Sequence, residues 1–154
     1  MIVIGIDPGV SGGIAFYSGF VSEMTTCEKM PPTESELSDT FVDWPSATTF
    51  AYIERVHSSP QMGVKSAFTF GQNYGFLRGC LVAHGIPFEE VRPQQWMREF
   101  GMKKSKTETP VQWKNRLKGK AQQLFPHLKV TLATADALLI CEYGRRLRCQ
   151  PEKR

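Results

Sequence analysis

Residues 1–17, MIVIGIDPGVSGGIAFY, decide the fold that the sequence predicts. An apolar, β-branched run leads into Asp7, a Pro-Gly turn follows at once, and a second apolar run starts at Gly13. This pattern predicts two strands joined by a tight turn. Asp7 is the single acid of the stretch, and a carboxylate at the end of a buried strand either belongs to the turn or faces a site.

The segments that follow alternate between strand and helix patterns. Further strands are expected over residues 20–27, 49–56 and 86–93, the first of them completing an amino-terminal antiparallel meander. Helices are expected between Thr33, a capping residue, and Pro45, and over residues 63–84, 94–100, 111–125 and 134–148. This order predicts an α/β domain with a mixed sheet.

The totals describe an ordinary globular chain. Its 154 residues predict a single domain spanning 1–154. No apolar run is long enough to cross a bilayer, and no signal peptide is visible, so we expect no membrane association and an intracellular, cytoplasmic location. The cysteines, which lack C-x-x-C spacing, are expected to be reduced thiols, and the histidines stand at no zinc-ligand spacing to them.

Charge is distributed unevenly along the chain. Residues 1–91 hold 4 Lys and Arg against 10 Asp and Glu, whereas residues 92–154 hold 15 against 5. A basic half of this kind is typical of a polyanion-binding face, and a merely solvated basic surface is the alternative.

Three acids, Asp7, Glu54 and Asp136, each stand alone in an apolar segment. Ionised carboxylates in such surroundings are costly unless they are paired or bound to a cation, so convergence of the three would call for a divalent metal ion. The simpler alternatives are a turn role for Asp7, an ion pair of Glu54 with Arg55, and a helix-dipole role for Asp136.

Four motifs carry a resemblance to a known family. These are GIDPGVSGG at 5–13, AYIERV at 51–56, FGQNYGFLRG at 70–79 and TADALLICEYGRR at 134–146. In order and spacing they resemble the motifs of RuvC-like Holliday junction resolvases, particularly the bacteriophage branch. The resemblance implies an RNase H-like fold, with a five-stranded mixed sheet, an antiparallel three-stranded meander and helices on both faces. It also implies an endonuclease of DNA recombination and repair, acting in a bacterial host cell if the origin is a phage.

The same resemblance implies how the acids act. Asp7, Glu54 and Asp136 would be the catalytic residues and would hold two Mg²⁺ ions, with Mn²⁺ as a substitute. The enzyme would make paired symmetrical cuts in a four-way junction, leaving 5′-phosphate and 3′-hydroxyl ends. The family usually has a fourth ligand one helical turn before the last aspartate. Leu132 and Ala133 stand there and cannot ligate, which leaves a replacement such as Glu142 or His127, or poor cutting, as the alternatives.

DNA binding is expected from the basic half. The residues expected to contact phosphates are Lys103, Lys104, Lys106, Lys114, Arg116, Lys118 and Lys120. Three arginines at the end of the last expected helix are further candidates for phosphate contacts, and their alternative role is as cations at the carboxyl end of that helix: Arg145, Arg146 and Arg148.

The resemblance implies a homodimer with helix 63–84 at its interface, although intrachain packing of its glycines is the alternative. Phe68, Phe70 and His57 are candidates for stacking on bases, with core packing as the alternative for the two phenylalanines.

Other functions compete with junction cleavage. One alternative is a branched-DNA binding protein that cuts weakly, which the lack of a fourth ligand motivates. Another is a less specific flap or Y-structure nuclease, because the same site would cut any branch that reaches it. DPGVSGG is also similar to the phosphate loop of actin-like ATPases, but those need two such domains. No G-x-G-x-x-G opens a helix after the first strand, so the sequence does not predict a Rossmann dinucleotide-binding domain. We expect no small-molecule cofactor.

Overall fold

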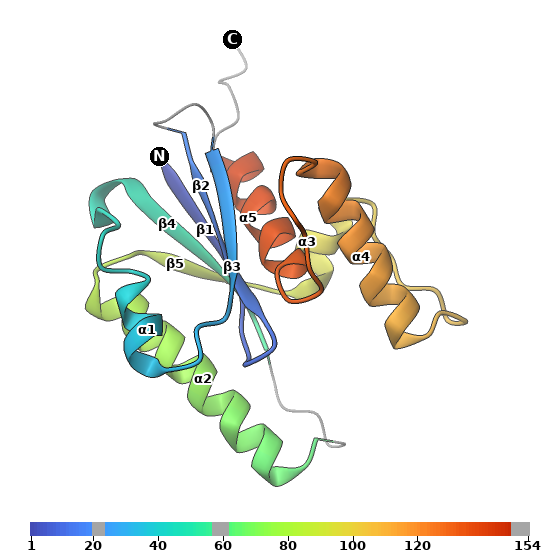
Figure 1. The fold of residues 1–154 in the computed structure, drawn as a ribbon, viewed down its shortest axis with the longest axis horizontal. Coiled ribbons are helices and arrows are strands. Elements are labelled where there is room, and N and C mark those ends of the chain that lie inside the picture. Colours follow the sequence, from blue (N-terminus) through green and yellow to red (C-terminus); the bar gives the residue numbers. More distant parts are fainter. Residues whose placement is uncertain (20–23, 57–61, 149–154) are drawn as a thin grey trace.

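A computed structural model describes residues 1–19, 24–56 and 62–148 and contains a five-stranded mixed sheet (Figure 1). The strands are β1 (Ile2–Asp7), β2 (Gly13–Ser18), β3 (Met24–Lys29), β4 (Thr49–Glu54) and β5 (Phe88–Val91), in the spatial order β3-β2-β1-β4-β5. The first three pair antiparallel, and β4 and β5 join parallel to β1. The predicted meander and mixed sheet are confirmed. The expected third strand begins at Met24, and residues 20–23 lie outside the described part.

Helices cover both faces of this sheet (Figure 1). They are α1 (Glu34–Asp39), α2 (Val64–Ala83), α3 (Pro93–Glu99), α4 (Pro110–Leu124) and α5 (Ala135–Arg148), with a short 3-10 helix, η1 (Ser46–Thr48), before β4. α1 and α2 lie on one face, and α3, α4 and α5 lie on the other. As predicted, Thr33 caps α1, accepting a hydrogen bond from the backbone N–H of Glu36.

The alternation of side chains along β1 assigns each residue to one face. Ile4 and Ile6 pack into the core under α1 and α2, whereas Val3 packs under α5. Because successive side chains in a strand point to opposite faces, Asp7 shares the face of Val3. The same rule puts Glu54 of β4 on the face of Tyr52, which packs in the α5 core. Both acids therefore belong to the α5 side of the sheet.

Gly5 permits α5 to lie directly against β1. A Cβ atom built on Gly5 would come within 2.2 Å of the backbone nitrogen of Cys141 and 2.4 Å of the carbonyl oxygen of Ala137. No larger residue fits there unless the helix moves away. This close contact fixes the beginning of α5 beside the last residues of β1.

α2 is covered over only part of its length. Its buried residues, Leu77, Cys80 and Leu81, lie in its carboxyl-terminal half. Cβ atoms built on Gly71, Gly75 or Gly79 would meet no described residue within 4 Å, so intrachain packing of these glycines, one of the two expectations, is not found in the part of the chain that the structure describes.

The structure also bears on smaller expectations. Core packing of Phe68 is wrong, since its side chain is 66% exposed. Cys27, Cys80 and Cys141 are free thiols, whereas Cys149 and His57 lie outside the described residues. Over residues 1–19, 24–56 and 62–148, no helix is long and apolar enough to span a membrane.

Candidate active site

Asp7 and Glu54 end two neighbouring parallel strands. β1 and β4 pair up to Ile6 and Ile53, so the next residue of each strand is one of the two acids. Parallel strands present their carboxyl ends at the same edge of a sheet, and both side chains share the α5 face. Strand register and side-chain alternation thus bring Asp7 and Glu54 to the same edge and the same face of the sheet.

Asp136 reaches the same edge from the first turn of α5. Its neighbour Ala137 contacts the backbone at Gly5, two residues before Asp7. The Asp136 side chain is only 5% exposed. The close packing of α5 on β1 therefore brings the third acid to the other two.

The three carboxylates act on one another electrostatically. Burial raises the pKa of Asp7 well above its usual range, and the charges of Asp136 and Glu54 raise it further. Burial also raises the pKa of Glu54 to about 7, and the charge of Asp136 adds to this shift. A hydrogen bond from Nε1 of Trp96 to Oε1 of Glu54, 2.9 Å long, works in the opposite direction. Such mutual destabilisation of buried charges marks functional sites.

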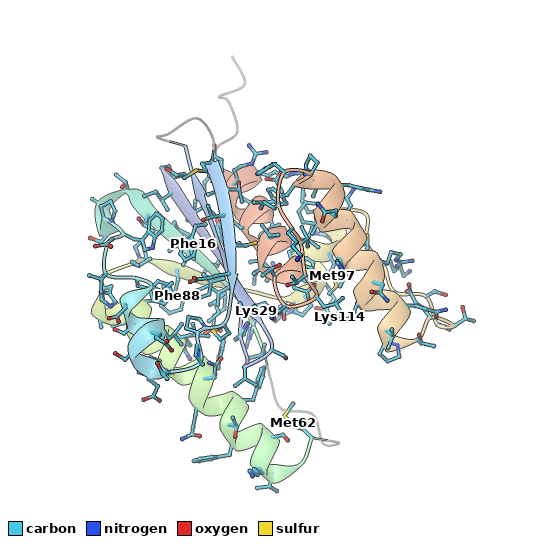
Figure 2. All side chains as sticks on the ribbon, in the orientation of Figure 1. Phe16, Lys29, Met62, Phe88, Met97 and Lys114 are labelled. Carbon is cyan, nitrogen blue, oxygen red and sulfur yellow. The ribbon has the colours of Figure 1, made fainter. Side chains whose placement is uncertain are left out.

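Lys114, on α4, is the cation that faces these acids. Its Nζ lies 2.5 Å from Oδ2 of Asp136. Figure 2 shows Lys114 on the side of α4 that is turned toward α5. Burial lowers the pKa of Lys114, but the charge and hydrogen bond of Asp136 and the charges of Asp7 and Glu54 outweigh this, so the pKa is raised.

The three carboxylates are donors of the kind that a divalent cation takes, but their positions in the described part of the chain do not form a metal site. Carboxylate oxygens are the ligands that Mg²⁺ and Mn²⁺ prefer. Oδ1 of Asp136 is buried and has no hydrogen-bond partner within the described part of the chain, which is the state of an oxygen that awaits a ligand. Within these same ranges, no three Asp, Glu, His or Cys side chains are gathered closely enough to hold one ion. Asp136 is paired with Lys114 instead.

No replacement for the fourth ligand stands out. Ala133 and Leu132 precede α5, as the sequence indicated. The carboxylate of Glu142 is held by Nε of Arg145 at 2.6 Å and by Nε of Arg146 at 2.9 Å. His127 is exposed and its ring lies edge-on to that of Phe125.

The residues expected to bind DNA lie on α4 and the loop before it. Lys103, Lys104 and Lys106 are exposed in this loop, and Lys118 and Lys120 are half-buried on the helix. Arg116 already has partners, because Nη2 lies 3.4 Å from Oε2 of Glu108 and its guanidinium stacks over the ring of Trp113.

The arginines at the end of α5 serve the fold. Arg145 and Arg146 hold Glu142, and Arg146 also pairs with Glu99 at 3.3 Å. Nε of Arg148 donates a 3.0 Å hydrogen bond to the hydroxyl of Tyr52. This supports their role as helix-end cations that tie α5 to its neighbours.

Two features of the site were missed in the sequence. Trp96, the partner of Glu54, is fully buried on α3. The sequence predicted the helix that contains Trp96 but not its contact with Glu54. A cavity of about 620 Å³ is lined by Arg55, which directly follows Glu54 in the sequence, by Arg92 and Arg98, and by three other residues. The signal for this cavity was Arg92, just before α3, and Arg98, in the last turn of α3; the charge count included both arginines without locating them.

Comparison with known proteins supports the fold. No family model matches the chain, and no curated protein matches it in sequence. Among solved structures it is similar to RuvC of Thermus thermophilus, with a TM-score of 0.61 and 15% identity over 97% of this chain and 96% of the other. It is also similar to T. thermophilus RuvC in complex with Holliday junction substrate, with a TM-score of 0.63 and 16% identity over 96% and 97% of the two chains. The RNase H-like fold that the motifs implied is confirmed.

Proposed function

We propose that this chain is a single RuvC-like nuclease domain, of the bacteriophage type, that resolves four-way DNA junctions. The observation that carries the proposal is the convergence of Asp7, Glu54 and Asp136 at one edge of the sheet, with the pKa of Asp7 raised by burial and by the other two charges. Proteins rarely keep one buried and two half-buried acids together for structural reasons alone, because each charge raises the cost of ionising the next.

Divalent metal ions are the cofactor that this donor set accepts, with Mg²⁺ as the working ion and Mn²⁺ as a substitute. When bound, such an ion supplies charge neutralisation at the phosphate and an activated water for hydrolysis. Two ions per site is the number that the resemblance implies. Asp7 and Glu54 would hold the metal from the strand ends, and Asp136 would hold it from α5.

The chain's own residues shape this site in further ways. Trp96 fixes the orientation of Glu54 through its indole N–H and keeps one flank of the carboxylate dry. A carboxylate held in one rotamer loses less entropy on binding a ligand than a free one.

The DNA would lie across the basic side of the domain. Lys103 and Lys104 line a groove of about 590 Å³ with Met97, Arg98 and residues of α3 and α4. Arg98 also lines the arginine cavity, and so does Gln94, so the two basic grooves share part of their lining. A phosphate backbone bound along them would be neutralised by these lysines and arginines.

A homodimer would place two such sites on opposed strands of one junction. The support is one exposed side of the amino-terminal half of α2, where Val64 is 87% and Phe68 is 66% exposed and where Cβ atoms built on Gly71 and Gly75 would meet no described residue within 4 Å. Exposed apolar residues on a helix without an intrachain partner favour a subunit interface.

The test is cleavage of end-labelled four-way junction, Y-structure and plain duplex, with and without Mg²⁺. Wild type is compared with Asp7→Asn and with Asp43→Asn, which changes an exposed acid in the same way. Paired symmetrical nicks that need metal and vanish only in Asp7→Asn are expected.

Two results would favour the alternatives. Tight junction binding without nicks in any variant would indicate a branched-DNA binding protein, for which the absence of a ligand at Ala133 is the motivating observation. Equal cutting of junction and Y-structure would indicate a less specific branch nuclease.

A further inference from the structure

Helix α3 separates two grooves of different chemistry. An α-helix turns once in about 3.6 residues, so residues four apart lie in one row on its surface. Gln94 and Arg98 form such a row, the α3 ridge, and both line the two grooves. Pro93 and Met97 form the next row and line only the groove of about 590 Å³. Gln95, on the other side of the ridge, lines only the arginine cavity of about 620 Å³.

The arginine cavity contains positive charge that its surroundings do not neutralise. Its guanidinium groups, on Arg55, Arg92 and Arg98, form no ion pair with any residue in the ranges 1–19, 24–56 and 62–148. Glu90 also lines the cavity, but its carboxylate is paired with Arg78 of α2 at 3.2 Å. Guanidinium groups bind phosphate through two parallel hydrogen bonds, so this cavity suits the phosphates of a polyanion.

The groove on the other side of the ridge is lined mainly by apolar residues. Met97 and Met102 are only partly buried against the core, and both line this groove. Gly101, with a φ of +65° that suits glycine, reverses the chain after α3. The N–H of Met102 then donates a 2.9 Å hydrogen bond to the carbonyl oxygen of Met97. Lys103 and Lys104, both exposed, add cations to the same lining.

Arg116 of α4 holds the loop that forms one wall of the apolar groove. Its Nη2 donates a 2.5 Å hydrogen bond to the carbonyl oxygen of Lys103 and lies 3.4 Å from Oε2 of Glu108. Its guanidinium carbon lies 4.8 Å from the ring centroid of Trp113, which also lines the groove. The groove is therefore formed without a ligand, which lowers the entropic cost of binding one.

We propose that α3 binds a short single-stranded segment of DNA, with its phosphates in the arginine cavity and its unpaired bases in the apolar groove. The inference rests on the proposed function, which makes the polyanion DNA. Sites for single strands combine cations that follow the backbone with apolar surfaces that hold the bases, and the α3 ridge has one on each side. Methionine side chains adapt to flat rings of any base.

This site distinguishes single strands from duplex. Bases inside a duplex are stacked and paired, so they must leave the stack before they can enter a groove on a protein. The phosphates of a duplex can still reach the arginine cavity. The α3 site therefore favours branched DNA that contains unpaired nucleotides over plain duplex.

The test measures binding in EDTA, so that it does not depend on cleavage. The full chain is titrated into three labelled probes of equal length, a single-stranded dT oligomer, an abasic oligomer and a duplex, and fluorescence anisotropy is measured. Wild type should bind the dT oligomer about tenfold more tightly than the abasic oligomer, because only the dT oligomer has bases to place in the groove.

Variants assign this difference to the groove. Met97→Gln and Met102→Gln keep the length of the side chain but make the lining polar. Each should weaken binding of the dT oligomer about fivefold and leave binding of the abasic oligomer and of the duplex unchanged. Arg98→Gln should weaken binding of all three probes. Met24→Gln and Lys129→Gln, at exposed residues of β3 and of the segment before α5, are the matched controls and should behave as wild type.

The outcomes separate the inference from the function on which it rests. Equal binding of the dT and abasic oligomers by wild type would overturn the inference and leave the nuclease proposal standing, and this result does not depend on any variant folding. An equal loss for both oligomers in Met97→Gln, shown to be folded by circular dichroism, would overturn it as well. Binding of none of these probes, nor of a four-way junction, would defeat DNA binding itself and the inference with it. The expected dependence on bases, without metal-dependent nicks in any branched DNA, would support the inference and contradict the nuclease activity alone.

Discussion

The indole N–H of Trp96 donates a 2.9 Å hydrogen bond to Oε1 of Glu54 across 42 positions of sequence. Trp96 is fully buried, and Glu54 ends a strand beside the other two acids. One contact thus ties helix α3 to the carboxylate edge of the sheet. It also stabilises the ionised form of Glu54, because a carboxylate accepts this bond more strongly than a neutral acid does.

Replacing Trp96 with Phe should raise the pKa of Glu54 above its present value of about 7. The ring still fills most of the cavity, but the carboxylate loses a donor worth about 1.5–3 kcal/mol to a charged group. Mn²⁺ affinity as a function of pH should therefore shift upward by about one pH unit. Trp113→Phe, in the same core, is the control and should leave the profile in place. Identical profiles for wild type and Trp96→Phe would contradict the assigned role.

The metal-free protein should lose stability as the pH rises from 4.5 to about 7. Burial raises the pKa of Glu54 from 4.5 to about 7, so in this window the folded chain keeps a proton that the unfolded chain has released. The free energy of unfolding then falls with increasing pH, by on the order of 3 kcal/mol from this group. Asp7, whose pKa is also raised by burial, contributes with the same sign.

Urea unfolding in EDTA at about pH 5 and about pH 8 measures this effect. The change in stability between the two pH values should be smaller in Glu54→Gln, which has no proton to lose there. Glu89→Gln, at an exposed acid of β5, controls for the lost charge and should behave as wild type. If wild type and Glu54→Gln lose stability equally, the pKa of Glu54 is not raised in the folded chain.

Gly5→Ala should destabilise the fold by about 3 kcal/mol or more, since the added methyl group would strike the backbone of α5. Gly71→Ala is the matched control, because its methyl group would meet no described residue within 4 Å, and alanine favours a helix over glycine by about 1 kcal/mol. Chemical denaturation of both variants at low protein concentration checks the contrast. Equal effects would mean that α5 does not lie this close to β1.

Removing the loop cations should weaken DNA binding in a salt-dependent way. The triple change of Lys103, Lys104 and Lys106 to Ala should reduce the slope of log affinity against log salt by about 0.9 for each phosphate that the protein no longer neutralises. Lys129→Ala is the control at an exposed lysine outside this set. Fluorescence anisotropy with a labelled junction at several salt concentrations measures the slope. An unchanged slope would indicate that the DNA binds another face of the protein, with the arginine cavity as the next candidate.

Short-range patterns in the sequence predicted many of the strands and helices of this protein. Alternating apolar residues predicted β1 and β2, and three- and four-residue spacing predicted α2 and α4, because burial of one face imposes these periods. The three acids stood out for a related reason. A charge in an apolar run conflicts with its surroundings, and that conflict is visible without any knowledge of the fold.

The partners of those acids were decided only by the tertiary structure. Lys114 has the same sequence surroundings as the other lysines of α4, and Trp96 looks like any apolar helix residue. Their contacts with Asp136 and Glu54 cross 22 and 42 positions. Such contacts depend on how closely helices approach the sheet, and at Gly5 this distance is fixed by the absence of a single methyl group. Local sequence preferences carry no information about that approach, since it results from packing between segments far apart in the chain.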